Sequence, residues 1–348
     1  MYQFPNQPYP AGYQTEFSEA QVREKRALFI NASKLGGLLL IYSALQYVLV
    51  RVYYIAAASY HSGSLILLPW DAISYLRGQP DFVRSTTFSM LGNLLTVLLS
   101  VTILLIIAKF VMKVHFGEML RPKAEHLPQA LKWMPMCLVI NIVIAIVISY
   151  IEAYLSAFGI AMPDSDFTIV KPSALALTLQ FLYVIVIGPL AEELIYRGLI
   201  LTLLRPFGKW LAVFFSALIF GIMHGNIPQA ASAFGSAIVM ALIAVSCGSI
   251  VPTIIIHILN NAIASYSDFS DVMKWGYADE IQMGIQIVIF FIGVFIILAY
   301  GWQLPPKNDN NYALSSKERF KGVFCNILMA AYFVYSLYNI IAAFIRIN

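Results

Sequence analysis

Long apolar stretches separated by short polar ones run along almost the whole chain. A helix that crosses a membrane needs about 20 mostly apolar residues, and about nine stretches reach or approach that length. The apolar residues occur in runs, whereas a membrane barrel alternates at every second residue. The pattern predicts an all-α, polytopic membrane bundle. The expected spans are residues 35–59, 87–112, 133–158, 173–203, 209–225, 228–246, 249–266, 281–302 and 322–345.

Composition agrees with this fold class and excludes others. Of the 348 residues, 60% are hydrophobic and 11% are charged, and the mean hydropathy is +0.76. A soluble domain of this size has far more polar surface, and a disordered chain has far fewer apolar residues. A soluble enzyme and a disordered chain are therefore excluded, and the expected surroundings are a lipid bilayer.

The distribution of basic residues predicts the topology. The net charge of +4 comes mainly from loop lysines and arginines, which gives no reason to expect a nucleic-acid partner. With a cytoplasmic N-terminus, the loops inside carry about three times as many basic residues as those outside. We therefore expect a cytoplasmic N-terminus and an external C-terminus. The N-terminal tail, the aromatic spans and the lack of organelle signals favour a bacterial plasma membrane.

The chain divides into four parts. Residues 1–34 form a cytoplasmic tail, partly disordered over 1–16, with a short interfacial helix over 17–34. Transmembrane helices over 35–172 and 267–348 flank a segment, 173–266, in which the ionisable residues lie inside spans. Because ionisable groups are costly in a bilayer, they usually mark a functional site.

The spacing of these polar residues suggests how they interact. Glu193 and Arg197 are four residues apart, so they share a helix face and can pair, whereas Glu192 points about 100° away. His257 and Asn261 also share a face, and Pro189 is expected to kink the helix just before the glutamates.

Each of these features has a structural explanation when taken alone. The ion pair can join helices, and histidines and asparagines often hydrogen-bond helices together in membranes. The combination, with Glu192 left unpaired in an apolar span, favours a functional site. Asn260 is expected to face elsewhere and to serve as a polar contact between helices.

Three motifs in order resemble a known family. They are Glu-Glu-x-x-x-Arg, Phe-x-x-x-His and His-x-x-x-Asn, each on an apolar helix. This combination is similar to that of the CPBP intramembrane proteases, which include type II CAAX prenyl endopeptidases and bacterial immunity (Abi) proteins. The resemblance covers about residues 173–266. The matching residues are Glu192, Glu193, Arg197, Phe220, His224, His257 and Asn261.

The resemblance implies an endopeptidase that cleaves a membrane-associated peptide or protein with an activated water. Glu192 would be the general base, His224 would hold the water, and His257 and Asn261 would donate to the oxyanion. Glu193, Arg197 and Phe220 would support these four residues.

Two alternatives stay open. Glu192, His224 and His257 could instead bind zinc, with Glu193 as the base, so no cofactor is firmly implied and zinc remains an option. The chain could also be a non-proteolytic membrane protein that binds a peptide, as in bacteriocin self-immunity.

Overall fold

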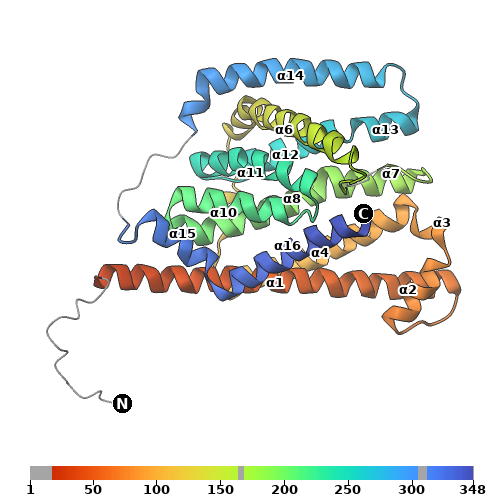
Figure 1. Ribbon diagram of the computed structural model, residues 1–348, viewed down its shortest axis with the longest axis horizontal. Coiled ribbons are helices and arrows are strands. Elements are labelled where there is room, and N and C mark those ends of the chain that lie inside the picture. The colour runs from red at the N-terminus through yellow and green to blue at the C-terminus, as the bar shows by residue number, and fades with distance from the viewer. Residues whose placement is uncertain (1–17, 164–167, 305–311, 348) are drawn as a thin grey trace, which may run out of the picture.

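The computed structural model describes residues 18–163, 168–304 and 312–347, and all regular elements in these ranges are helices (Figure 1). The predicted disorder over residues 1–16 lies outside the described ranges. The longer helices are α1 (Glu19–Ser62), α4 (Thr86–Phe110), α6 (His126–Ser156), α10 (Lys209–Ile222), α11 (Ile227–Cys247), α12 (Val251–Ala264), α14 (Ala278–Tyr300) and α16 (Ile327–Ile347). The shorter ones are α2 (Pro69–Arg77), α3 (Pro80–Val83), α5 (Phe116–Met119), α7 (Ala174–Gln180), η1 (Phe181–Ile187), α8 (Gly188–Glu193), η2 (Leu194–Ile200), α9 (Leu201–Leu204), η3 (Arg205–Phe207), α13 (Tyr266–Met273), η4 (Gly301–Gln303) and α15 (Ser316–Phe324).

The described helices confirm an all-α, polytopic membrane protein. Seven helices in these ranges are long and apolar enough to cross a bilayer, and each overlaps a predicted span. The predicted fifth and seventh spans correspond to α10 and α12, which have 14 residues each. At about 21 Å, each is shorter than a hydrocarbon core of about 30 Å. Because α10 and α12 are too short to cross the hydrocarbon core, polar residues near their ends, such as His224, are expected to lie within it.

The first helix is longer than the predicted first span. A short interfacial helix leading into the membrane was expected over 17–34, and in the structure these residues begin α1, one continuous helix of 44 residues. The Ser18 hydroxyl accepts a hydrogen bond from the Gln21 main-chain N–H, and the Gln21 side chain accepts one from the Ser18 N–H. This capping box starts the helix well before its apolar part. With a length of about 66 Å, α1 extends beyond one membrane surface.

The last predicted span, 322–345, is divided in two. Helix α15 ends at Phe324, and α16 begins at Ile327. Asn326 lies between them, accepts hydrogen bonds from the N–H groups of Leu328 and Met329, and donates to Ser33 of α1. A side chain that caps one helix and contacts another fixes the angle at which α16 packs on α1.

The fourth span is interrupted by two π-helical segments. It runs through α7, η1, α8, η2 and α9, in which η1 and η2 are π-helical segments. Pro189 lies at the start of α8, just after η1. Proline has no N–H to donate to the preceding turn, and π-bulges are common causes of helix distortion. The predicted irregularity at Pro189 thus takes the form of a π-helical segment before the two glutamates.

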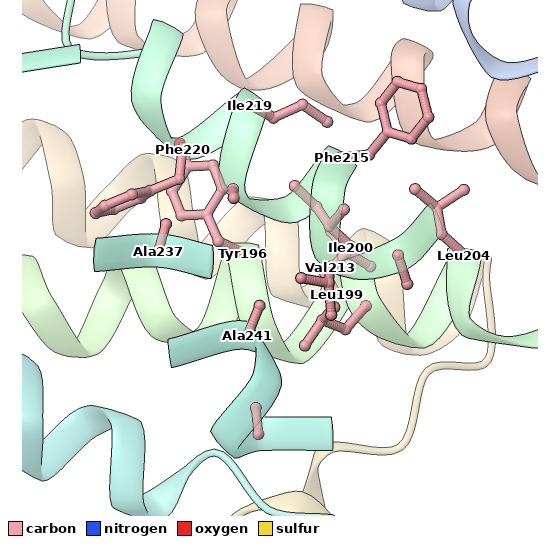
Figure 2. Close-up of a cluster of buried hydrophobic side chains, with 14 of the residues drawn as sticks. Tyr196, Leu199, Ile200, Leu204, Val213, Phe215, Ile219, Phe220, Ala237 and Ala241 are labelled. Carbon is pink, nitrogen blue, oxygen red and sulfur yellow. The ribbon is translucent and has the colours of Figure 1, made fainter. Parts of the chain in front are cut away.

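The core forms where the fourth span packs against α10 and α11. Figure 2 shows Leu199, Ile200 and Leu204 of the fourth span beside Phe215 and Ile219 of α10. Small residues at the contact let α11 approach closely. A Cβ on Gly221 would lie 2.8 Å from the Ala230 carbonyl oxygen of α11. This close approach positions the end of α10.

The bundle has two distinct ends. Helix α15 lies at one end, whereas α2, α3 and α13 lie at the other (Figure 1). Because α10, α11 and α12 follow one another through short turns, Lys209 and Cys247 share the α15 end. His224 and Ala264 lie toward the α13 end.

Candidate functional site

The four residues predicted to be catalytic line one cavity of about 460 Å³. Glu192 comes from α8, His224 follows α10, and His257 and Asn261 lie on α12. The Glu192 side chain is 25% exposed, so its carboxylate is accessible from the cavity. Other lining residues are Asn141, Tyr183, Val184, Gly188, Pro189, Phe220, Met223, Gln229, Ser232, Ala233, Ser236, Asn260, Ala264, Ser265 and Asp268.

Glu193 and Arg197 form the ion pair that their spacing predicts. Arg197 Nη1 donates to Glu193 Oε1 across 2.6 Å, and both side chains are fully buried. The Arg197 guanidinium also lies 4.6 Å from the centre of the Phe220 ring. Because a buried charge without a partner is costly, each residue of the pair compensates the other, and the contact of Glu193 with His257 joins the helix that carries Glu192 to α12.

His257 lies between the two glutamates. Its Nδ1 is 3.0 Å from Glu193 Oε1, and its Nε2 is 3.5 Å from Glu192 Oε2. A carboxylate that is paired with arginine only accepts hydrogen bonds, so Nδ1 carries the proton of the shorter contact. This contact directs Nε2 of His257 toward Glu192.

Four charged or chargeable groups thus form a row. Its order is Glu192, His257, Glu193 and Arg197. With His257 protonated, negative and positive groups alternate along the row, and each charge has a neighbour of the opposite sign. Such a row lowers the energetic cost of ionised groups in a low-dielectric bundle.

Phe220 packs against both histidines. The centre of its ring is 5.0 Å from that of His224 and 5.7 Å from that of His257, with the rings edge to face in both cases. His224 Nδ1 lies 2.9 Å from the Phe220 carbonyl oxygen. Since that oxygen can only accept, Nδ1 donates, and Nε2 is the basic nitrogen of the neutral ring. The same residue therefore orients His224 through both its ring and its main chain.

Asn261 joins the site to the irregular part of the fourth span. Its side-chain N–H donates to the Val184 carbonyl oxygen across 2.8 Å. Its carbonyl oxygen accepts from Asn260 across 3.2 Å, and the carbonyl oxygen of Asn260 accepts from Asn141 of α6 across 3.1 Å. Three amide side chains thus connect α6 and α12 to η1.

Two of these residues were missed or misplaced by the sequence analysis. Asn260 was expected to face elsewhere, but it lines the same cavity as Asn261. It does serve as a polar contact between helices, through Asn141. Asn141 was not considered. An asparagine in the middle of an apolar span is the sequence signal that could have identified it, because such polar groups in membranes usually have hydrogen-bond partners on other helices.

The proposed zinc ligands do not form a recognisable metal site. Across the described ranges, no three His, Cys, Asp or Glu side chains are grouped so as to hold a metal ion. The residues present therefore do not fit a zinc ion as arranged.

Comparison with known proteins supports the family that the motifs suggest. Residues 174–263 match the model of a family described as type II CAAX prenyl endopeptidase Rce1-like. The match includes all seven residues of the three motifs. No curated protein and no solved structure matches the chain. The resemblance to CAAX proteases is thereby confirmed for this segment.

Proposed function

We propose that this chain, whose residues 174–263 match the Rce1-like type II CAAX prenyl endopeptidases, hydrolyses a peptide bond with a water activated by Glu192. The observation that carries the proposal is the accessible Glu192 carboxylate beside His257, in a cavity that also contains His224 and Asn261. A buried structural glutamate would instead be enclosed and paired, as Glu193 is.

In the first step, Glu192 takes a proton from a water in the cavity. The water oxygen attacks the substrate carbonyl carbon, and the carbonyl π electrons move to oxygen and form a tetrahedral oxyanion. His224, whose Nε2 is basic in the neutral ring, accepts a hydrogen bond from the water and orients it. As the oxyanion re-forms the carbonyl and the C–N bond breaks, Glu192 returns its proton to the leaving nitrogen, which gives a carboxylic acid and an amine.

The oxyanion needs hydrogen-bond donors that are fixed before the reaction. We assign this role to His257 and Asn261. An asparagine amide has two N–H donors, and Asn261 uses one on Val184, so the second is available to the substrate. His257, when protonated, donates through Nε2, and its charge is balanced by Glu193 on the other side of the ring.

Glu193, Arg197 and Phe220 are positioning residues in this proposal. The ion pair is fully buried, and it contacts the cavity-lining residues His257 and Phe220. Its effect on the reaction passes through the orientation of His257 and of the helix that carries Glu192.

The proposed substrate is a membrane-associated peptide or protein. The N-terminus would lie in the cytoplasm of a bacterial cell, because basic residues such as Arg205 and Lys209 are concentrated at the α15 end. The cavity is lined by Gln229 at the start of α11 and Ser265 after α12, at the opposite end. The peptide would therefore enter from the non-cytoplasmic half of the membrane.

Comparative peptidomics of membranes tests the activity. Cells that produce the wild type are expected to release peptides that are missing with Glu192→Gln, which keeps the shape of the side chain but removes the base. Loss of general base catalysis alone lowers a rate by about 10²–10⁴-fold. Glu280→Gln, a change of an exposed glutamate at the α13 end, is the matched control and should behave as wild type.

The same experiment distinguishes the non-proteolytic alternative. If Glu192→Gln retains full biological activity and the two peptide profiles are identical, the proposed hydrolysis is wrong. Peptide binding or self-immunity on the same fold would then be the better explanation.

The orientation has a separate test. In a cysteine-free background, Tyr60→Cys near the end of α1 and Lys317→Cys on α15 place exposed thiols at opposite ends of the bundle. An impermeant maleimide added to intact cells should label the first and not the second. The reverse pattern would contradict the proposed topology.

A further inference from the structure

A second, larger cavity lies at the α15 end of the bundle. It has a volume of about 870 Å³ and is bordered by α1, the segment that follows α4, the end of the fourth span, α10 and the turn after α11. It shares no lining residue with the catalytic cavity. Its chemistry therefore has no part in the proposed reaction.

The second cavity is strongly basic. Four lining residues are Lys34, Lys113, Arg205 and Lys209, with His115 beside them, and Glu118 is the carboxylate among the described lining residues. The described part of the chain provides no ion-pair partner for Lys34, Lys113 or Arg205, and all three side chains are exposed. Several cations that face one space, three of them without an ion-pair partner in the described ranges, favour the binding of an anion.

The segment that carries Lys113 is held in place. Lys113 has a left-handed backbone conformation with φ of 58°, and the next residue, Val114, is buried and donates its N–H to the Ala108 carbonyl oxygen across 3.1 Å. Further along, the Met119 carbonyl oxygen accepts from both the hydroxyl of Ser249 and the N–H of Ile250. The basic groups are thus attached to a fixed wall of the cavity.

Apolar surface beside the cations indicates the source of the anion. Phe110 and Val111, just before the lining segment, are 71% and 66% exposed, and Trp210 next to Lys209 is 44% exposed. Exposed aromatic and apolar side chains beside lysines are typical of the boundary between lipid headgroups and acyl chains. A free phosphate would use the cations but would gain nothing from these apolar neighbours.

We propose that this cavity binds the phosphate headgroup of an anionic glycerophospholipid in the cytoplasmic leaflet. The phosphodiester lies between Lys113 and Arg205, and the acyl chains lie along Phe110 and Val111 at the end of α4. Basic pockets between transmembrane helices on the cytoplasmic side bind anionic headgroups elsewhere by the same chemistry.

The test uses the purified full-length chain in a neutral detergent. Binding of phosphatidylglycerol, phosphatidylcholine and inorganic phosphate is followed by native mass spectrometry and by the shift in melting temperature. The variant is Lys113→Asn with Arg205→Gln, because asparagine tolerates a positive φ. The matched control is Lys274→Asn with Arg77→Gln, which changes an exposed lysine of φ 54° and an exposed arginine at the other end.

We expect phosphatidylglycerol to bind and to raise the melting temperature, and phosphatidylcholine to do neither. The Lys113/Arg205 variant should bind phosphatidylglycerol about 30-fold more weakly, which corresponds to about 1 kcal/mol for each basic residue. The control variant should bind as the wild type does. Since the assay measures binding alone, its result does not depend on proteolysis.

Three results would overturn the proposal. They are equal binding of the two lipids, equal losses in the variant and its control, and stabilisation by inorganic phosphate that equals that by phosphatidylglycerol. The last result would assign the cavity to a free phosphate compound.

Discussion

The side-chain amide of Asn261 donates a hydrogen bond to the main-chain carbonyl of Val184. This carbonyl lacks a partner within its own helix for two reasons. The Gly188 N–H, which would bond it in an α-helix, donates to Tyr183 instead. In the π-helical pattern the donor would be residue 189, which is a proline without an N–H. Asn261 of α12 thus supplies the hydrogen bond that the fourth span cannot make.

This relationship predicts a compensating pair of substitutions. Asn261→Ala should lower the free energy of unfolding by about 0.5–1.5 kcal/mol, because it removes the hydrogen bond to the carbonyl oxygen of the half-buried Val184. Adding Pro189→Ala restores an N–H at the position that faces Val184, so the double variant should regain part of the loss. Thermal unfolding in detergent measures both. A double variant that is less stable than either single variant would contradict this account.

The buried ion pair predicts a second cycle of variants. Arg197→Met removes the guanidinium and leaves Glu193 as an uncompensated buried charge, which should cost about 3–5 kcal/mol. Combining it with Glu193→Gln removes both charges, and most of the stability should return. Chemical unfolding of the single and double variants gives the coupling energy, and purely additive effects would show that the pair is unimportant for stability. The double variant is still expected to be inactive, because Glu193→Gln removes the ionic contact that orients His257.

Metal removal separates the two hydrolytic mechanisms. With a water activated by Glu192 alone, the purified protein should contain little zinc, and a chelator should leave cleavage unchanged. Elemental analysis and activity before and after chelation provide the measurements. A metal-dependent mechanism would replace this one if the protein contains about one zinc per chain, if chelation removes zinc and activity together, and if added zinc restores activity. The residues of the site would stay the same.

The contact between α10 and α11 predicts an effect of a single methyl group. In Gly221→Ala, the new Cβ would lie 2.8 Å from the Ala230 carbonyl oxygen and 3.0 Å from Phe234 Cβ. We expect a loss of about 1–3 kcal/mol in stability and a fall in activity, since His224 lies three residues further along. Gly284→Ala on α14, where a Cβ would meet nothing within 4 Å, is the matched control. It should be neutral or slightly stabilising, because alanine favours helix more than glycine does. Equal effects of the two changes would show that the close approach at Gly221 is unimportant.

Several features of the fold could be predicted from sequence because they depend on one helix at a time. Apolar length determines whether a segment suits a bilayer, which is why the nine expected spans coincide with seven long helices and two short ones. The Glu193–Arg197 pair follows from a spacing of four residues within one helix. The motifs on three apolar helices were also sufficient to suggest the family that residues 174–263 match.

The differences between prediction and structure concern places where a helix begins, ends or changes its type. Residues 19–34 continue directly into the first span because the capping box at Ser18 starts a single helix. The break at Asn326 depends on a hydrogen bond to Ser33, almost 300 residues away in the chain. Hydropathy averages over a window and cannot detect either event.

The sequence by itself determined the membrane-spanning helices and the polar residues that they carry. Only the tertiary structure decided which atoms meet: His257 between Glu192 and Glu193, and Asn260 in the same cavity as Asn261. The physical reason is that helical periodicity sets the direction of a side chain around its own axis alone. The offset and rotation between helices depend on close packing, as at Gly221 against Ala230, and on hydrogen bonds such as that from Asn261 to Val184.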